Sequence, residues 1–107
     1  MSDKTPTNLT EVIEAAAAAL EATERRATDT GAEWSIGGIT FAAVGPDHAD
    51  FRLARLVAEA ALRTPDTSRS VRGRDWVVFQ PAEVDKHAID RAIAWLASAW
   101  RRADGEG

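Results

Sequence analysis

The hydrophobic positions in the first third of the chain repeat with the period of a helix. The run begins at a capping box, Asn8-x-x-Glu11, in which Asn8 accepts from the third helical amide and Glu11 reaches back. Asp29, Thr30 and Gly31 end the run, and Gly31 suits a left-handed helix cap. One helix is therefore predicted from residue 8 to the segment 29–31. Its apolar face consists of Leu9, Val12, Ile13, Ala16, Leu20 and Ala27.

Alternation replaces the helical period between residues 33 and 44. Two short strands are predicted around Gly37-Gly38, because both glycines accept the positive φ of a tight hairpin turn. A phosphate-binding loop explains the pair less well, since no G-x-x-x-x-G-K-S/T motif follows and no helix starts there. A turn is predicted next, over residues 45–48. The alternating apolar positions of the two strands are Trp34, Ile36, Ile39, Phe41 and Ala43.

Residues 49–63 allow two interpretations. We favour a third strand over residues 49–53, followed by a helix that runs to Arg63 and stops before Pro65. In the alternative, Asp50 caps a longer helix and the third strand disappears. The positions with helical spacing are Leu53, Leu56, Val57, Ala60 and Ala61.

Residues 68–80 combine strand-forming side chains with concentrated positive charge. This pattern predicts a second hairpin with the tip Arg72-Gly73-Arg74. The second arm, residues 76–79, is apolar on both faces, which is typical of a central strand. Pro81 cannot donate to a strand partner and therefore ends this arm.

The closing helix has the clearest boundaries. Asp85 is a suitable N-cap, and Val84 and Ile89 have the spacing of a hydrophobic staple. We expect Trp95 and Trp100 to belong to the core rather than to a base-stacking surface, because they lie on or beside the apolar face. That face consists of Ala88, Ile89, Ala92, Ile93, Trp95, Leu96, Ala99 and Trp100.

The order of elements predicts an α+β fold, α-β-β-β-α-β-β-α. We expect a two-layer sandwich with an antiparallel sheet of about five strands, helices at both termini and one helix in the middle. A single domain is expected over residues 8–103, with a disordered tail at residues 1–7 and a second tail at residues 104–107.

Charge and composition exclude some classes of function for this protein. The net charge of −4 combines nine acids and three bases in residues 1–50 with eight acids and ten bases in residues 51–107. This is typical of an ordinary acidic protein, although it leaves a modest basic excess in the second half. The absence of cysteine excludes disulfides and thiolate sites. No apolar run is long enough for a bilayer and no signal-peptide pattern begins the chain, so a cytoplasmic protein without a membrane partner is expected.

Catalytic constellations are missing from the sequence. The serines at positions 68 and 70 have no histidine at a motif spacing, and His87 is expected at a helix surface without an identified partner. The cluster Asp47, His48 and Asp50 is interpreted as turn chemistry, because no second ligand group matches it. We therefore expect no enzymatic activity, no cofactor and no metal.

Three short motifs carry a family resemblance: GGITFA at residues 37–42, GRDWV at 73–77 and SAW at 98–100. With them the chain resembles the MmcQ/YjbR-like family of small bacterial proteins over residues 8–102. The resemblance implies a two-layer α/β fold likened to secretion chaperones and a double-wing DNA-binding motif. The chain departs from the family near Leu53, where the proline or acid that commonly opens the middle helix is missing.

The wing implied by this resemblance is the hairpin of residues 69–76. In it, Arg69, Arg72 and Arg74 contact DNA phosphates and Gly73 allows a tight tip. The alternative is that these arginines keep an exposed hairpin soluble. Two other functions stay open, a protein–protein interaction module or homodimer, and a small-molecule site between sheet and helix.

A surface criterion separates these hypotheses. A continuous positive patch that joins the wing to Arg52, or to Arg101 and Arg102, favours DNA binding. Scattered arginines paired with Asp66, Asp75 and Asp104 disfavour it.

Overall fold

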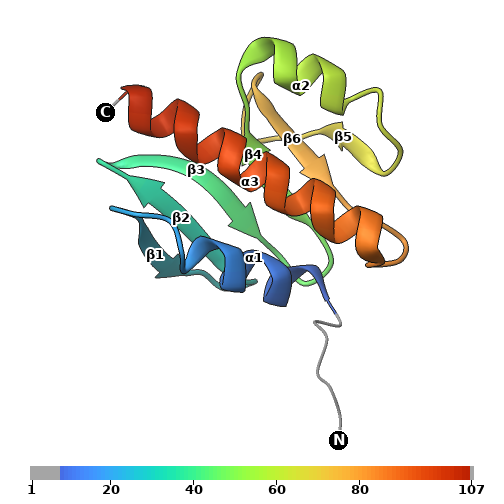
Figure 1. The fold of residues 1–107 in the computed structure, drawn as a ribbon, viewed down its shortest axis with the longest axis horizontal. Coiled ribbons are helices and arrows are strands. Elements are labelled where there is room, and N and C mark those ends of the chain that lie inside the picture. The colour runs from blue at the N-terminus through green and yellow to red at the C-terminus, as the bar shows by residue number, and fades with distance from the viewer. Residues whose placement is uncertain (1–7, 107) are drawn as a thin grey trace, which may run out of the picture.

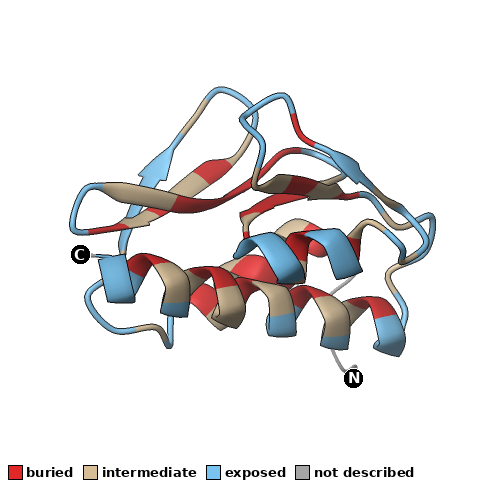
Figure 2. Cartoon of the chain, turned by 90° about the horizontal axis from the view of Figure 1, so that it is seen from above, coloured by how far each residue is buried: buried red, intermediate tan, exposed pale blue. Residues whose placement is uncertain are grey.

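The computed structural model describes residues 8–106 and has two layers, a six-stranded antiparallel sheet and a layer of helices (Figure 1). The strand order from edge to edge is β1-β2-β3-β4-β6-β5. Figure 2 shows the helices on one side of the sheet, so that its other face carries no helix of the described chain. The elements are α1 (Leu9–Ala17), β1 (Glu24–Ala27), β2 (Ala32–Ile36), β3 (Ile39–Val44), β4 (Ala49–Arg52), α2 (Arg55–Ala61), β5 (Thr67–Arg69), β6 (Trp76–Phe79) and α3 (Lys86–Glu106).

The predicted α+β sandwich is confirmed, with helices near both ends and one in the middle. The sheet has one strand more than the predicted number of about five. The predicted tail at residues 1–7 lies outside the described residues. None of the helices between residues 8 and 106 has the length and apolar character needed to cross a membrane.

The first helix is shorter than predicted. Asn8 caps it as expected, with Oδ1 accepting from the amide of Glu11 at 2.8 Å. However, α1 ends at Ala17, and the chain passes through Ala22 with a left-handed φ of 60°. It then continues as the edge strand β1, which pairs antiparallel with β2. The prediction of a continuous helix to residues 29–31 is therefore wrong.

Two arginines account for this extra strand. Arg25 donates to both carboxylate oxygens of Glu14 on α1, at 2.8 and 2.7 Å. Arg26 donates to Glu33 on β2 at 2.6 Å. These contacts, together with the β1–β2 ladder, hold residues 24–27 in the sheet, where helical spacing alone predicted a helix.

The glycines play two different roles. Gly37 and Gly38 have φ values of 59° and 83°, which confirms the predicted tight hairpin between β2 and β3. Gly31 is not the helix cap that was predicted. A Cβ at Gly31 would lie only 2.1 Å from the carbonyl oxygen of Val44, so glycine permits the close approach of the chain before β2 to the end of β3.

A β-bulge in β3 changes which side chains face the helices. Ala42 lies opposite Trp34, whereas Thr40 lies opposite Ser35, so that Phe41 is an extra residue between the two pairs. Phe41 and Ala42 are consequently both buried in the core. The bulge interrupts the simple alternation predicted for this strand. The residues after it point to the opposite side of the sheet from the one that alternation predicts.

The middle of the chain follows the favoured interpretation, a strand and then a helix. Leu53 is completely buried in the link between β4 and α2. The helix α2 ends at Ala61, earlier than predicted, and buries the small residues Ala58 and Ala61. Leu56, predicted on its apolar face, is 77% exposed. Leu53 is buried but lies before α2 begins. The side of α2 that packs against the protein therefore differs from the side predicted from the spacing of the apolar residues.

The helix α3 begins as predicted and ends later. Asp85 accepts a hydrogen bond from the amide of Ala88 at 2.9 Å, which confirms it as the N-cap. Residues 104–106, predicted as a tail, belong to α3. Glu106 forms ion pairs with Arg52 and Arg102 at 2.7 and 3.2 Å, and these contacts stabilise the last turn of the helix.

The core lies between the sheet and the helices α1 and α3. Trp95 packs edge-on against Phe79 at 5.2 Å between ring centres and lies 6.3 Å from Phe51, which confirms its predicted place beside the core. The indole of Trp100 donates to the carbonyl of Glu21 at 3.1 Å and so joins α3 to the link after α1. The side chains that α3 buries are mostly small, which lets the helix approach the sheet closely: Ala88, Ala92, Leu96, Ala99 and Ala103.

Candidate functional site: an arginine-lined groove

The second hairpin is present and is part of the sheet. Arg69 on β5 lies opposite Val77 on β6, and the amide of Ser70 donates to the carbonyl of Trp76 at 3.1 Å. The strand β6 lies between β4 and β5, as predicted for a central strand. Val77 and Phe79 are buried on its helix-covered side. The tip of the hairpin therefore extends from a well-buried base.

Arg72, one of the predicted contact residues, is occupied by contacts within the protein. Its Nη2 donates to Oε2 of Glu33 at 3.0 Å, and its Nε lies 3.5 Å from Oδ2 of Asp50. Its guanidinium carbon is 5.2 Å from the centre of the Trp76 ring, a cation–π distance. Both carboxylates belong to distant strands, so Arg72 ties the hairpin tip to the open face of the sheet.

The buried carboxylate of Asp50 fixes the same tip. The residue is only 6% exposed, and its Oδ2 accepts a 2.7 Å hydrogen bond from Oγ of Ser70. The Ser70 oxygen in turn accepts from the amide of Arg72 at 3.1 Å. Because Ser70 starts the tip and Asp50 lies on β4, this chain of hydrogen bonds determines how the hairpin bends.

Gly73 makes room for the ring on which Arg72 lies. A Cβ at this position would be 3.2 Å from Cδ1 of Trp76, closer than such contacts usually come. The amide of Trp76 donates to the Gly73 carbonyl at 3.2 Å, which closes the turn. The predicted role of Gly73 in a tight tip agrees with this geometry.

The turn at residues 45–48 contains a histidine between two acids. Nδ1 of His48 is 3.1 Å from Oδ1 of Asp47, and Nε2 is 3.4 Å from Oδ1 of Asp50. The hydrogen bond from His48, with another from Gln80, lowers the pKa of Asp47. Across residues 8–106, no set of three or more histidine, cysteine or acidic side chains is placed to hold a metal ion.

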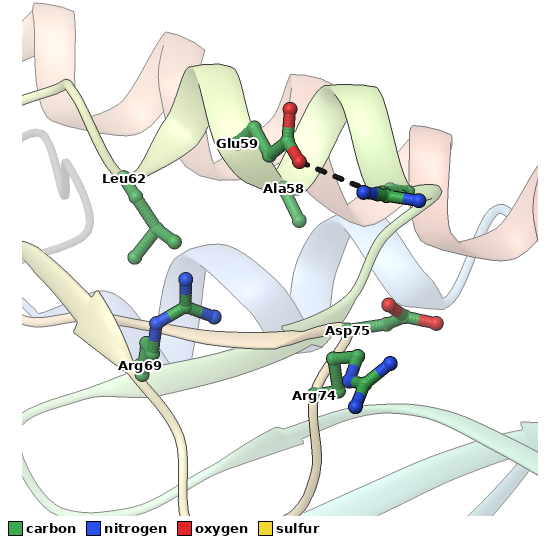
Figure 3. A pocket seen from close by; sticks show the side chains of 7 residues that line it. Ala58, Glu59, Leu62, Arg69, Arg74 and Asp75 are labelled. Atoms are coloured by element: carbon green, nitrogen blue, oxygen red, sulfur yellow. Dashed lines mark hydrogen bonds and ion pairs between the residues drawn. The ribbon is translucent and has the colours of Figure 1, made fainter.

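A groove of about 430 Å³ lies between α2 and the second hairpin. Figure 3 shows Leu62 on the α2 side and Arg69 on the β5 side pointing toward one another across it. Arg74 and Asp75 approach from the β6 end of the hairpin. We call this feature the arginine groove; its lining consists of Arg55, Ala58, Glu59, Leu62, Arg69, Arg74 and Asp75.

Two of the predicted contact residues, Arg69 and Arg74, meet in this groove. Among the side chains of residues 8–106, neither has a hydrogen-bond or ion-pair partner. Arg55 from α2 joins them; its side chain is 83% exposed, and within residues 8–106 its one ion-pair contact is with Glu59, 3.4 Å away and one turn along the helix. Arg55 was not among the residues predicted to contact phosphate. The sequence feature that pointed to it was its place in the first turn of the predicted middle helix.

Two other arginines near the groove, Arg52 and Arg102, are in ion pairs. Arg52 donates to Glu106 at 2.7 Å, and Arg102 donates to Asp75 at 3.0 Å and to Glu106 at 3.2 Å. The hydrogen bonds from Arg52 and Arg102 lower the pKa of Glu106. The arginine groove is therefore not continued by free charges at Arg52 or Arg102. By the criterion set from the sequence, this pairing of Arg52, Arg72 and Arg102 with acids counts against DNA binding.

No protein-family model, curated protein or solved structure matches this chain. The resemblance to the MmcQ/YjbR-like family therefore stays a prediction from its three motifs.

Proposed function

We propose that this chain is a small non-enzymatic binding protein that contacts the phosphates of nucleic acid through the arginine groove. The observation that carries the proposal is that Arg69 and Arg74 lie on one groove with no acidic partner in the described chain. Guanidinium groups bind phosphate oxygens through paired, charge-assisted hydrogen bonds. The motif resemblance favours DNA as the nucleic acid.

The anchoring of the hairpin supports this function. Arg72, Asp50 and Ser70 hold the tip on the sheet, so that Arg69 and Arg74 project from a fixed backbone. A binding site with a fixed backbone loses less conformational entropy when its ligand arrives. Arg72 thus takes part as a positioning residue, in place of the direct phosphate contact that the sequence predicted.

The chemistry of the same region supports a non-enzymatic role. Ser70 is the most buried hydroxyl near the tip, and its Oγ donates to the carboxylate of Asp50. A serine nucleophile needs a general base that accepts its proton during attack, commonly a histidine. The nearest histidine, His48, contacts Asp47 and Asp50 instead.

Fluorescence anisotropy with short labelled DNA, at about 20–50 mM salt where phosphate contacts are strongest, tests the proposal. We expect binding that the double variant R69A/R74A weakens at least about tenfold, since charge-assisted hydrogen bonds contribute about 1.5–3 kcal/mol each. The control is K86A/R91A, which removes two positive charges from α3 away from the groove. Equal binding by both double variants, or no binding by the unaltered protein, contradicts the proposal.

A second function, a protein–protein interaction module or homodimer, is favoured by a different observation. Val71 at the hairpin tip is fully exposed and Leu56 on α2 is 77% exposed. A contact surface usually needs a contiguous apolar patch, so each of these two side chains would have to be the centre of a separate small contact. Sedimentation analysis over a range of concentrations decides: a dimer that V71S/L56S dissociates supports this function, and a monomer throughout excludes the homodimer.

A further inference from the structure

We propose that the arginine groove binds a terminal phosphate monoester of a nucleic-acid strand, in preference to the internal phosphodiesters. This inference rests on the proposed function and specifies which phosphate the groove accepts. It follows from three properties of the groove: its balance of charge, the pairing of the arginines around it, and its size.

The charge of the groove matches one dianion. Its lining holds three arginines and two carboxylates, and Arg102 is paired with one of those carboxylates, Asp75, at 3.0 Å. Arg102 also pairs with Glu106, which in turn pairs with Arg52, so the whole set holds five arginines and three carboxylates, a surplus of two positive charges. A phosphate monoester carries close to two negative charges at pH 7, whereas an internal phosphodiester carries one.

The surroundings of the groove favour the same conclusion. Backbone-tracking proteins present a stripe of unpaired cations along several phosphates. Here Arg52, Arg72 and Arg102 are each in an ion pair, and Arg63, which directly follows Leu62 in the chain, is a single exposed arginine without an ion-pair partner among the described residues. The net charge of −4 further weakens attraction to a long polyanion.

The size of the groove also fits a single group. Its volume of about 430 Å³ lies within the range of small-ligand sites. Ala58 and Leu62 give it an apolar wall on the α2 side. A wall of this kind can contact the terminal sugar or base while the arginines hold the phosphate.

The test compares three otherwise identical oligonucleotides of about 12 nucleotides, labelled on an internal base, with a 5′-phosphate, a 3′-phosphate or hydroxyls at both ends. We expect at least one phosphorylated form to bind about tenfold more tightly than the form without a terminal phosphate, since one extra charged contact contributes about 1.5–3 kcal/mol. R69A/R74A removes this difference and K86A/R91A keeps it. Inorganic phosphate competes with the phosphorylated form.

The outcomes separate this inference from the proposed function. Equal binding of all three oligonucleotides, weakened by R69A/R74A, keeps the proposed function and overturns the preference for a terminal phosphate. No binding of any oligonucleotide overturns both. A phosphoserine peptide that binds as tightly as the phosphorylated oligonucleotide overturns the assignment to a nucleic-acid end.

The salt dependence gives an independent readout. For a backbone-tracking protein, the slope of log affinity against log salt grows with the number of phosphates contacted, by about 0.9 each on duplex DNA or about 0.7 on a single strand. For an end-binding groove, we expect the slope to stay constant when the oligonucleotide is lengthened. A slope that rises with length contradicts the inference.

Discussion

Arg102 on α3 holds the carboxylate of Asp75 through a 3.0 Å hydrogen bond from its Nη2. Asp75 directly follows Arg74 in the chain and lines the same groove. Because Asp75 is engaged by Arg102, Arg74 is left without an acidic partner in the described chain. The end of α3 thus sets the charge of a groove that lies between two other elements.

The variant Arg102→Ala is expected to destabilise the fold by about 1–3 kcal/mol, since the side chain donates to the carbonyl of Leu53 at 2.6 Å as well as to Asp75. Urea denaturation measures the loss. The matched control is Arg101→Ala, which removes an exposed charge one position earlier in the same helix. Equal effects of the two substitutions would show that the contacts of Arg102 add no stability.

Asp50→Ala is expected to cost about 1–3 kcal/mol and to loosen the hairpin tip, because Ser70 loses its buried acceptor and Arg72 loses one carboxylate. Asp50→Asn keeps an oxygen for Ser70 and should cost less. Hydrogen exchange of the amides in residues 70–76 reports the loosening. Unchanged exchange in Asp50→Ala would exclude Asp50 as the anchor of the tip.

Glu33 gives the fold a specific acid sensitivity. Hydrogen bonds from Arg26 and then from Arg72 lower its pKa in the folded state. A lowered folded-state pKa means that the contribution of Glu33 to stability is complete above its unfolded pKa of about 4.3 and is lost as the pH falls through the folded-state pKa.

Glu33→Gln should therefore make the loss of stability below about pH 4.3 shallower, while lowering stability near neutral pH. Urea denaturation at a series of pH values measures both effects. Glu24→Gln, on the exposed edge strand β1, serves as the control. Parallel pH profiles for Glu33→Gln and the unaltered protein would refute the role assigned to these ion pairs.

Gly31→Ala is expected to destabilise the protein by several kcal/mol or to prevent folding, because the new Cβ would lie 2.1 Å from the Val44 carbonyl oxygen. Both partners in this clash are backbone, which moves less readily than a side chain. Gly105→Ala is the control: its Cβ meets nothing within 4 Å, and alanine is the better helix former in α3. In thermal denaturation, Gly31→Ala should have a much lower midpoint temperature than Gly105→Ala. Similar midpoints would contradict the role of Gly31 in the close approach of the two backbone segments.

The features that could be predicted from the sequence depend on neighbouring residues. The turn at Gly37-Gly38 and the cap at Asp85 require only local backbone chemistry, and both agree with the structure. The strand β1 could not be predicted in this way, because Arg25 and Arg26 find their partners on α1 and β2. The prediction for residues 24–27 followed helix propensity, whereas tertiary contacts decide the structure of this segment.

The candidate site shows the same limit. The arginine-bearing hairpin was recognisable from residues 68–80, but the separation of Arg72 from Arg69 and Arg74 was not. Its partner Glu33 lies 39 positions earlier in the chain. Arg55 likewise reaches the groove only because α2 packs beside the hairpin. Local sequence therefore identified the positive charge, and long-range packing decided which charges stay available.

The position of α3 in the chain has a consequence for synthesis. This helix of 21 residues follows every strand, and its buried face covers the side of the sheet that carries Phe41, Phe51 and Phe79. A chain emerging from the ribosome can pair β1 to β4 through short connections, but its aromatic face is covered only in part, by α1, until α3 has been made. During that interval the nascent protein is prone to aggregate or to be bound by chaperones. Substitutions that slow the docking of α3 should therefore reduce the yield of folded protein more than they reduce its final stability.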